Sequence, residues 1–180
     1  MPLDKFNLSK VKASGEGVEI TFSKKAVNPV DGNLGGNLDN DALPHPDLLE
    51  LLKGLKPYLL KSLRIQQLHD TAVKYLKGDQ KKKFLEDWKE IEDTLEITGV
   101  SWSGKDDLEG VIISGKYSNQ LEGKTPLNSP RIVFSSEILG YEQKVQKHVE
   151  RIRIEAHKYF FEGKKAQGEL FDEKNMEKVA

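Results

Sequence analysis

The four histidines are the side chains of this 180-residue chain best suited to proton transfer or metal binding near neutral pH. They are His45, His69, His148 and His157, and no two of them have the spacing that places two imidazoles on one helical face. The chain has no cysteine, which excludes disulfides, thiolate nucleophiles and cysteine-ligated metals. We therefore expect no metal site and no cofactor, and we interpret the histidines as ordinary surface or half-buried residues.

One segment is close to the pattern of a phosphate-binding loop. Residues 99–106, Gly-Val-Ser-Trp-Ser-Gly-Lys-Asp, have the glycine and lysine spacing with which backbone N–H groups and an ammonium hold phosphate. Asp106 stands where a hydroxyl should bind magnesium, and a turn and a strand follow instead of a helix. Residues 110–116 repeat the spacing inside a predicted strand. Strands bounded by glycines explain both matches, so we expect no nucleotide site.

Aromatic and basic residues on the predicted strands indicate a second kind of chemistry. Trp102 and Tyr117, with Lys105 and Lys116 nearby, could form a platform on which the bases of a single strand stack. The same residue types are common on the core side of a sheet. Lys and Arg total 28 against 29 Asp and Glu, a net charge of −1, so no global field attracts nucleic acid. A single-stranded nucleic-acid-binding module is therefore kept as an alternative function.

The first half of the chain predicts a hairpin followed by helices. Phe6 to Phe22 alternates apolar and polar residues on either side of a glycine turn, which is typical of two paired strands. Residues 28–41 are rich in Asn, Asp and Gly and predict a loop. Leucines at 48, 51, 52 and 55 predict a helix that ends near Pro57, and two further helices are expected over residues 58–77 and 79–93.

The second half predicts strands and one long helix. Residues 95–102 alternate in two phases with Gly99 between them, where a β-bulge would absorb the change of phase. Residues 111–117 and 131–134 are further short strands, and residues 136–162 have the apolar stripe of an amphipathic helix. This order predicts an α+β fold, with an antiparallel sheet built from hairpins, helices packed on one face and a long C-terminal helix.

Length and hydropathy predict one domain over residues 1–163 and a flexible C-terminal tail over residues 164–180. No stretch approaches the ~18 consecutive apolar residues of a membrane span, and residues 1–5 lack the features of a secretion signal. We therefore expect a cytoplasmic protein that does not contact a membrane. The composition does not predict an oligomeric state.

The tail contains a short peptide that can be compared with known partners. Residues 167–171 read Gln-Gly-Glu-Leu-Phe, and two large apolar side chains in a polar tail gain by entering a partner's pocket. This peptide resembles the pentapeptide with which bacterial replication and repair proteins dock onto the DNA polymerase sliding clamp. The resemblance implies that Gln167, Leu170 and Phe171 bind the clamp, although Gly168 and Glu169 depart from the commoner residues. Residues 159–171 also resemble the tails of uncharacterised phage and prophage proteins.

Three functions follow from these patterns. The first is an accessory protein of phage or bacterial DNA replication or recombination, whose tail docks onto the sliding clamp. The second is the nucleic-acid-binding module. The third is an enzyme of an unrecognised class, for which no catalytic constellation is visible in the sequence. Leu170 and Phe171 have a structural alternative, because a terminus can also fold back onto its own domain.

Overall fold

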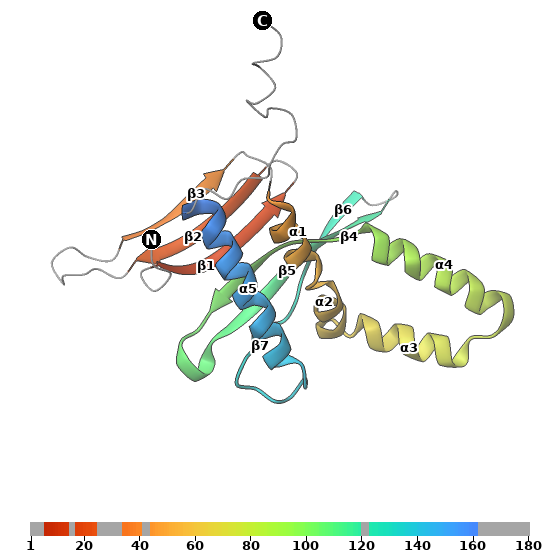
Figure 1. Ribbon diagram of the computed structural model, residues 1–180. Helices are drawn as coiled ribbons and strands as arrows, with labels where there is room; N and C mark the ends of the chain where they lie inside the picture. The colour runs from red at the N-terminus through yellow and green to blue at the C-terminus, as the bar shows by residue number, and fades with distance from the viewer. Residues whose placement is uncertain (1–5, 15–16, 25–33, 41–43, 120–122, 162–180) are drawn as a thin grey trace, which may run out of the picture.

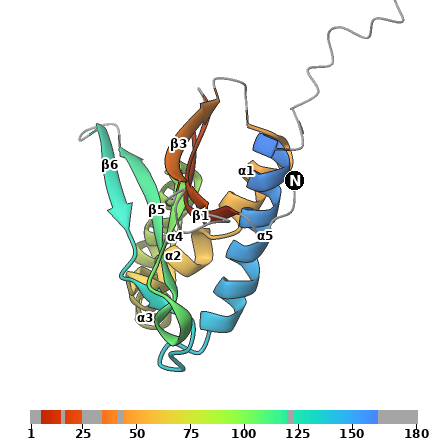
Figure 2. The ribbon, with the colours of Figure 1, turned by 90° about the vertical axis from the view of Figure 1, so that its left-hand side faces the viewer.

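The structure is a computed structural model that describes residues 6–14, 17–24, 34–40, 44–119 and 123–161. Its strands and helices form a two-layer arrangement in which helices cover one face of an antiparallel sheet (Figures 1 and 2). The strands are β1 (Phe6–Ser14), β2 (Gly17–Lys24), β3 (Leu34–Asn40), β4 (Leu95–Ser103), β5 (Gly110–Asn119), β6 (Gly123–Asn128) and β7 (Ile132–Val133). The helices are α1 (Pro46–Lys53), α2 (Lys56–Ser62), α3 (Ile65–Tyr75), α4 (Gly78–Thr94), the short 3₁₀ helix η3 (Asp106–Leu108) and α5 (Glu142–Phe161).

The sheet has the order β3-β2-β1-β4-β5-β6, and β7 pairs with β5. All of its pairs are antiparallel, and the predicted opening hairpin is confirmed as β1 and β2. The predicted bulge at Gly99 is confirmed as well, since the register of β4 on β5 shifts between Ile97 and Gly99. The bulge lies where β1 pairs with β4 and joins the two halves of the sheet.

The core lies between the sheet and the helices α1, α2 and α5 (Figure 2). Alternate residues of the strands point into this layer because side chains of a strand alternate between its faces. From the helices come the predicted leucine face of α1 and the apolar stripe of α5, so α5 packs on its own sheet. This arrangement confirms the α+β class. Its most completely buried side chains include Ile20, Leu48, Leu52, Leu55, Leu59, Leu95, Ile113 and Ile152.

The opposite face of the sheet carries ion pairs. Lys10 on β1 contacts Glu19 on β2 at 3.0 Å, and Lys116 on β5 contacts Glu96 on β4 at 2.7 Å. The hydrogen bond from Lys10 is the largest cause that holds the pKa of Glu19 below its usual value. This face is therefore polar, as expected for an antiparallel sheet covered on one side.

Two edge strands were not predicted. The expected loop over residues 28–41 is wrong from Leu34 onward, because Leu34–Asn40 pairs with β2 as β3. Gly123–Asn128 pairs with β5 as β6, although the sequence predicted no strand between residues 117 and 131. Both strands lie at the ends of the sheet, so the backbone ladder holds them without an apolar face of their own. Alternating hydrophobicity, the signal used to find strands, is weak in such segments.

The expected single helix over residues 58–77 is also wrong. It is divided at Arg64, which has a left-handed backbone with φ of 60°, so that α2 packs on the sheet and α3 turns away from it. The helix expected over residues 79–93 is α4, which begins one residue earlier, at Gly78, and ends at Thr94. Helices α3 and α4 form a hairpin that projects from the body of the protein (Figure 1), and we call residues 65–94 the arm.

Helix α5 begins at Glu142, six residues later than the predicted start at residue 136. The carboxylate of Glu142 accepts hydrogen bonds from the backbone N–H groups of Leu139 and Tyr141, which ties the preceding turn to the first residue of the helix. Within the described residues, no helix is both long and apolar enough to cross a membrane.

Candidate functional site

An open groove lies between two helical walls on the described surface. It has a volume of about 1230 Å³ and lies between residues 46–57, from α1 and the start of α2, and residues 148–158 of α5. Helices α1 and α5 run side by side along it (Figures 1 and 2). The two walls come from segments about 100 residues apart in sequence, so only the fold brings them together.

The groove has charges of both signs. Asp47 and Glu155 face each other near one end, while Lys53, Lys56 and Arg151 are among the basic side chains that line the rest. Lys158 contacts the carboxylate of Glu155 at 3.5 Å and neutralises part of that charge. A groove lined by both signs does not select an anion or a cation by charge alone.

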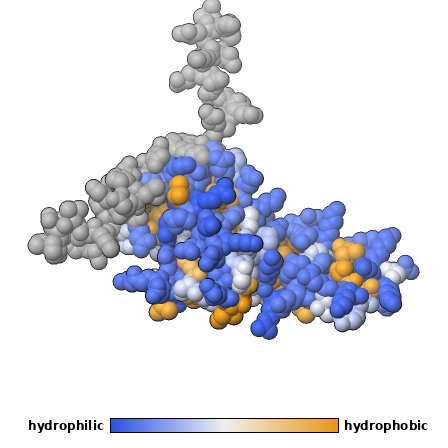
Figure 3. Space-filling model, turned by 60° about the horizontal axis from the view of Figure 1, so that its bottom comes forward, coloured by the Kyte–Doolittle hydropathy of each residue, from blue (hydrophilic) through white to orange (hydrophobic). Residues whose placement is uncertain are grey.

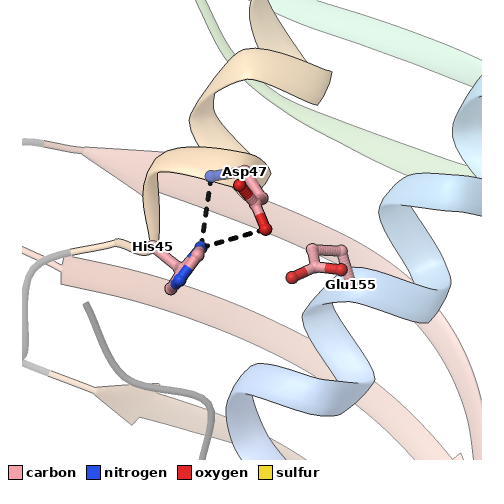
Figure 4. A group of neighbouring side chains, drawn as sticks. All are labelled: His45, Asp47 and Glu155. Carbon is pink, nitrogen blue, oxygen red and sulfur yellow. Dashed lines mark hydrogen bonds and ion pairs between the residues drawn. The ribbon is translucent and has the colours of Figure 1, made fainter. Parts of the chain in front are cut away.

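The residues with the clearest chemical capacity are His45, Asp47 and Glu155, which lie together at the end of the groove (Figure 4). One nitrogen or oxygen atom of each lies within 4.8 Å of the others. His45 and Asp47 stand at the start of α1, and Glu155 comes from the buried side of α5. An imidazole and two carboxylates are a donor set that Zn²⁺ or a similar divalent cation can use.

The geometry of His45 favours helix capping over metal binding. His45 is the N-cap of α1, and its Nδ1 accepts a hydrogen bond from the backbone N–H of Asp47 at 3.2 Å. The same Nδ1 lies 3.5 Å from the Asp47 carboxylate. The lone pair that would bind a cation is thus the one that satisfies a free N–H group of the helix. A cation at this cluster would have to break the cap, so we derive no metal chemistry from it.

The other end of α1 is tied to α5 by a second histidine. Nε2 of His148 lies 2.6 Å from the carbonyl oxygen of Leu51, and because a carbonyl only accepts, Nε2 carries the hydrogen. Leu51 belongs to the last turn of α1, whose carbonyls lack partners within the helix. The ring of His148 also meets the edge of Tyr58, with centroids 6.4 Å apart. Histidines therefore hold both ends of α1.

We predict that Gly54→Ala weakens this contact and lowers the free energy of unfolding by about 1 kcal/mol. An added Cβ would lie 2.6 Å from Cε1 of His148 and 2.9 Å from its Nε2, so the imidazole must move away from the Leu51 carbonyl. Urea unfolding measures the loss. Glu50→Ala, an exposed change one turn earlier in α1, is the control. Equal stability of Gly54→Ala and the wild type would show that the His148 hydrogen bond contributes little.

The four residues of the predicted stacking platform do not share one surface. Trp102 is 8% exposed and lies on the helix-covered face, where the guanidinium of Arg153 sits 4.8 Å from its ring centroid. Tyr117 is half-buried on the same face as Leu95, its partner across β4 and β5. Lys116 points to the opposite face, where it pairs with Glu96. This arrangement does not favour base stacking by Trp102, and nucleic-acid binding stays a prediction.

Lys105, the fourth residue of that platform, is exposed in the turn before η3. The residues 99–106 that came close to a phosphate-binding loop form the end of β4 and this turn, in agreement with the interpretation as a strand bounded by glycines. The loop around Lys105 is closed by Arg131, whose guanidinium donates to the carbonyls of Ser103 and Leu108.

The predicted clamp-binding residues Gln167, Leu170 and Phe171 lie outside the described residues. The same holds for the whole predicted tail over residues 164–180. The cluster of His45, Asp47 and Glu155 was not predicted from the sequence. Glu155 is 110 positions from His45, and no local pattern reports such a separation.

Comparison with known proteins adds no relative to these observations: no protein-family model, no curated protein and no solved structure matches this chain.

Proposed function

We propose that this chain is an accessory protein of phage or bacterial DNA replication or recombination that docks onto the sliding clamp through its tail peptide. The observation that carries the proposal is the peptide Gln167-Gly168-Glu169-Leu170-Phe171 itself. It begins six positions after α5 ends at Phe161, outside the elements that build the core. In this proposal the folded domain is the part that the tail delivers to the clamp.

The physical basis is the burial of two large side chains in a partner's pocket. Full burial of one such side chain, Leu170 or Phe171, would contribute about 1.5–3 kcal/mol to the free energy of binding before the costs of association. The Gln167 side chain supplies one donor and one acceptor group for polar contacts beside the pocket. Gly168 and Glu169 add no apolar area, so we expect micromolar affinity, which corresponds to about −8 kcal/mol.

Docking of the tail onto the clamp would change where the folded domain acts without changing the contacts between the domain and its ligand. A flexible tether converts a second binding event into an intramolecular one with an effective concentration near the millimolar range for short linkers. The binding site of the folded domain would then be occupied at the replication fork even by a weak ligand. This is why a short peptide with modest affinity is sufficient for an accessory protein.

Titration of the full chain against a bacterial sliding clamp by calorimetry tests the proposal. We expect binding by the wild type and at least a tenfold loss for the Leu170→Ala, Phe171→Ala double variant, because both apolar anchors are removed. A matched control is the Met176→Ala, Val179→Ala double variant, which removes two apolar side chains of the same tail outside the peptide. The control should bind as the wild type does.

Two outcomes would contradict clamp docking. The first is a wild type that shows no heat of binding at ~100 μM, where a weak specific complex still registers. Equal losses in the double variant and in the Met176 and Val179 control would show that general hydrophobicity of the tail, rather than the peptide, causes binding. In the first case Leu170 and Phe171 would be assigned to contacts with the chain itself.

A further inference from the structure

The arm contributes little to the core of the protein. No residue of α3 is buried, and Trp88 is the one buried residue of α4. The arm nevertheless holds two helices of 11 and 17 residues that project from the body (Figure 1). Helices of this length are marginal in water unless a packed face stabilises them. Contacts within one copy of the chain therefore cover little of the surface of either helix.

One seam of the arm is closed by aromatic side chains. The imidazole of His69 on α3 packs at a tilt against the ring of Trp88 on α4, with centroids 4.3 Å apart, and the Phe84 ring centroid lies 5.8 Å from that of the same imidazole. Nδ1 of His69 lies 3.0 Å from the carboxylate of Asp70, which orients the ring. These contacts hold α3 against α4 and leave the outer faces of both helices free.

Large apolar side chains remain on the outside of the arm. Leu68 is 70% exposed, Tyr75 is 69% exposed and Leu85 is 41% exposed. Leu68 and Tyr75 are seven residues apart, two helical turns, so they lie on one face of α3. Figure 3 shows hydrophobic side chains gathered on the projecting arm among hydrophilic ones. An amphipathic face with no partner in the same chain is typical of an interaction surface.

Charge on the arm is divided along its length. The tip, residues 74–83, contains five lysines and one aspartate, a net charge of +4. The base, residues 86–93, contains five carboxylates and one lysine, a net charge of −4. The lysines of the tip are Lys74, Lys77, Lys81, Lys82 and Lys83, and the carboxylates of the base are Glu86, Asp87, Glu90, Glu92 and Asp93.

The separation of positive and negative charge along the arm does not stabilise α4 within a single copy of the chain. Its last turn has no basic residue, although cations are favoured at a helix C-terminus by the macrodipole. Lys82 precedes Glu86 by four positions, which is the weaker order for an ion pair along a helix. Among the described residues, none of these lysines and carboxylates lies within ion-pair distance of an opposite charge. The charges are thus free to meet a partner.

We propose that the arms of two copies of this chain pair antiparallel about a two-fold axis and form a dimer. In this arrangement the basic tip of each arm lies on the acidic base of the other, so one contact is made twice. Leu68 of one copy lies opposite Tyr75 of the second, which removes the exposed face of both α3 helices from water. The four helices then bury a common apolar seam, the usual packing of an antiparallel bundle.

A second copy fits this surface better than a partner of one charge. A nucleic acid would be attracted to the tip but repelled by the base, and an acidic or basic protein would meet the same conflict. When two arms lie antiparallel, the +4 tip of each faces the −4 base of the other. An isologous interface requires a surface that is complementary to itself in this way. The proposal does not depend on docking of the tail to the sliding clamp.

Sedimentation equilibrium of the full chain between ~1 and ~100 μM is the first test, and we expect a dimer whose dissociation constant lies within that range. Leu68→Ser with Tyr75→Ser should raise the dissociation constant at least tenfold, because the apolar contact is lost. The tail variant Leu170→Ala, Phe171→Ala should dimerise as the wild type does. A wild type that stays monomeric at ~100 μM would overturn the proposal.

Charge reversal on the arm tests the proposed pairing without changing the apolar residues Leu68 and Tyr75. A tip variant carries Lys81→Glu, Lys82→Glu and Lys83→Glu, and a base variant carries Glu86→Lys, Asp87→Lys and Glu90→Lys. Each alone should be monomeric, because like charges then face each other. An equimolar mixture of the two should form a heterodimer, since each reversed surface meets its complement. Circular dichroism checks that both variants are folded.

The matched control is Lys144→Glu with Lys147→Glu, two exposed changes on α5 far from the arm in sequence, which should dimerise as the wild type does. Tip and base variants that each dimerise normally would overturn the antiparallel pairing, and so would a mixture that stays monomeric. A monomeric wild type that binds single-stranded DNA, with binding lost in the tip variant, would assign the tip to nucleic acid instead.

Discussion

Replacing Gly99 by alanine is expected to lower the free energy of unfolding by about 3 kcal/mol, the largest single loss of stability that we predict. An added Cβ would lie 2.4 Å from the carbonyl oxygen of Val11 and 3.0 Å from Cα of Lys12. Both are backbone atoms of β1, so no side-chain rotation relieves the clash. The strand itself must shift, and β1 is the one described strand that joins β2 and β3 to the rest of the sheet.

Urea unfolding of Gly99→Ala measures this loss, and Gly36→Ala on the edge strand β3 is the matched control. A Cβ at Gly36 would meet only the Phe22 ring at 3.7 Å, an ordinary contact distance, so the control should stay within about 0.5 kcal/mol of the wild type. If the two alanine variants are equally stable, the close approach of β1 and β4 at the bulge is not a constraint on the sheet.

The same glycine shows which features the sequence makes predictable. Gly99 was expected to be a bulge because the residues before and after it alternate in different phases, and the register shift from Ile97 to Gly99 confirms it. The leucine face of α1 was predictable for a similar reason, since Leu48 and Leu52 repeat at helical spacing. Leu55, at the next position of the same pattern, lies just beyond the end of α1, and all three side chains are at most 1% exposed. Elements that bury one face have apolar residues at regular spacing in the sequence, which makes them predictable.

The edge strands β3 and β6 lack this regular spacing of apolar residues. Gly36, Asn37 and Leu38 of β3 are exposed, and the strand is held by its register with β2 from Val18↔Asn40 to Lys24↔Leu34. Five of the six residues of β6 are likewise exposed. Backbone hydrogen bonds do not depend on side-chain type, so a glycine-rich and asparagine-rich segment can pair as a strand although its composition indicates a loop.

The break at Arg64 was unpredictable for a different reason. Left-handed backbone is normally adopted by glycine or asparagine, and neither stands between Leu63 and Ile65. The local sequence favours one continuous helix, and the turn is made where α2 has completed its packing on the sheet. Without this turn α3 would continue the line of α2, and the arm with its divided charge would not project from the body.

The groove required information that only packing supplies. Histidines at positions 45 and 148 were interpreted as ordinary residues, and each proves to bond one end of α1. Their roles depend on the antiparallel approach of α1 and α5, because this places Glu155 near the first turn of α1 and His148 near the last. Periodicity predicts which face of each helix is buried but not which helix covers it.

The second large effect that we predict is the loss of about 2 kcal/mol of stability at neutral pH on replacing Glu142 by glutamine. The Glu142 side chain is buried, at 3% exposure, and accepts hydrogen bonds from the N–H groups of Leu139 at 2.6 Å and Tyr141 at 2.9 Å. Burial alone would raise the pKa of this carboxyl, but the backbone donors outweigh it and hold the pKa below its usual value. Glutamine keeps one acceptor oxygen and turns an N–H₂ group toward the second donor.

The effect should depend on pH with a definite sign. Because the folded pKa of Glu142 is lowered, its contribution is complete above the unfolded value of about 4.3 and is lost as pH falls through the folded pKa. The stability difference between wild type and Glu142→Gln should thus be largest near pH 7 and close progressively in acid, as urea unfolding at a series of pH values measures. Glu137→Gln, an exposed change in the same turn, should match the wild type throughout. A difference that stays constant down to about pH 3 would show that the shape of the Glu142 side chain, and not the charge that its donors stabilise, positions the start of α5.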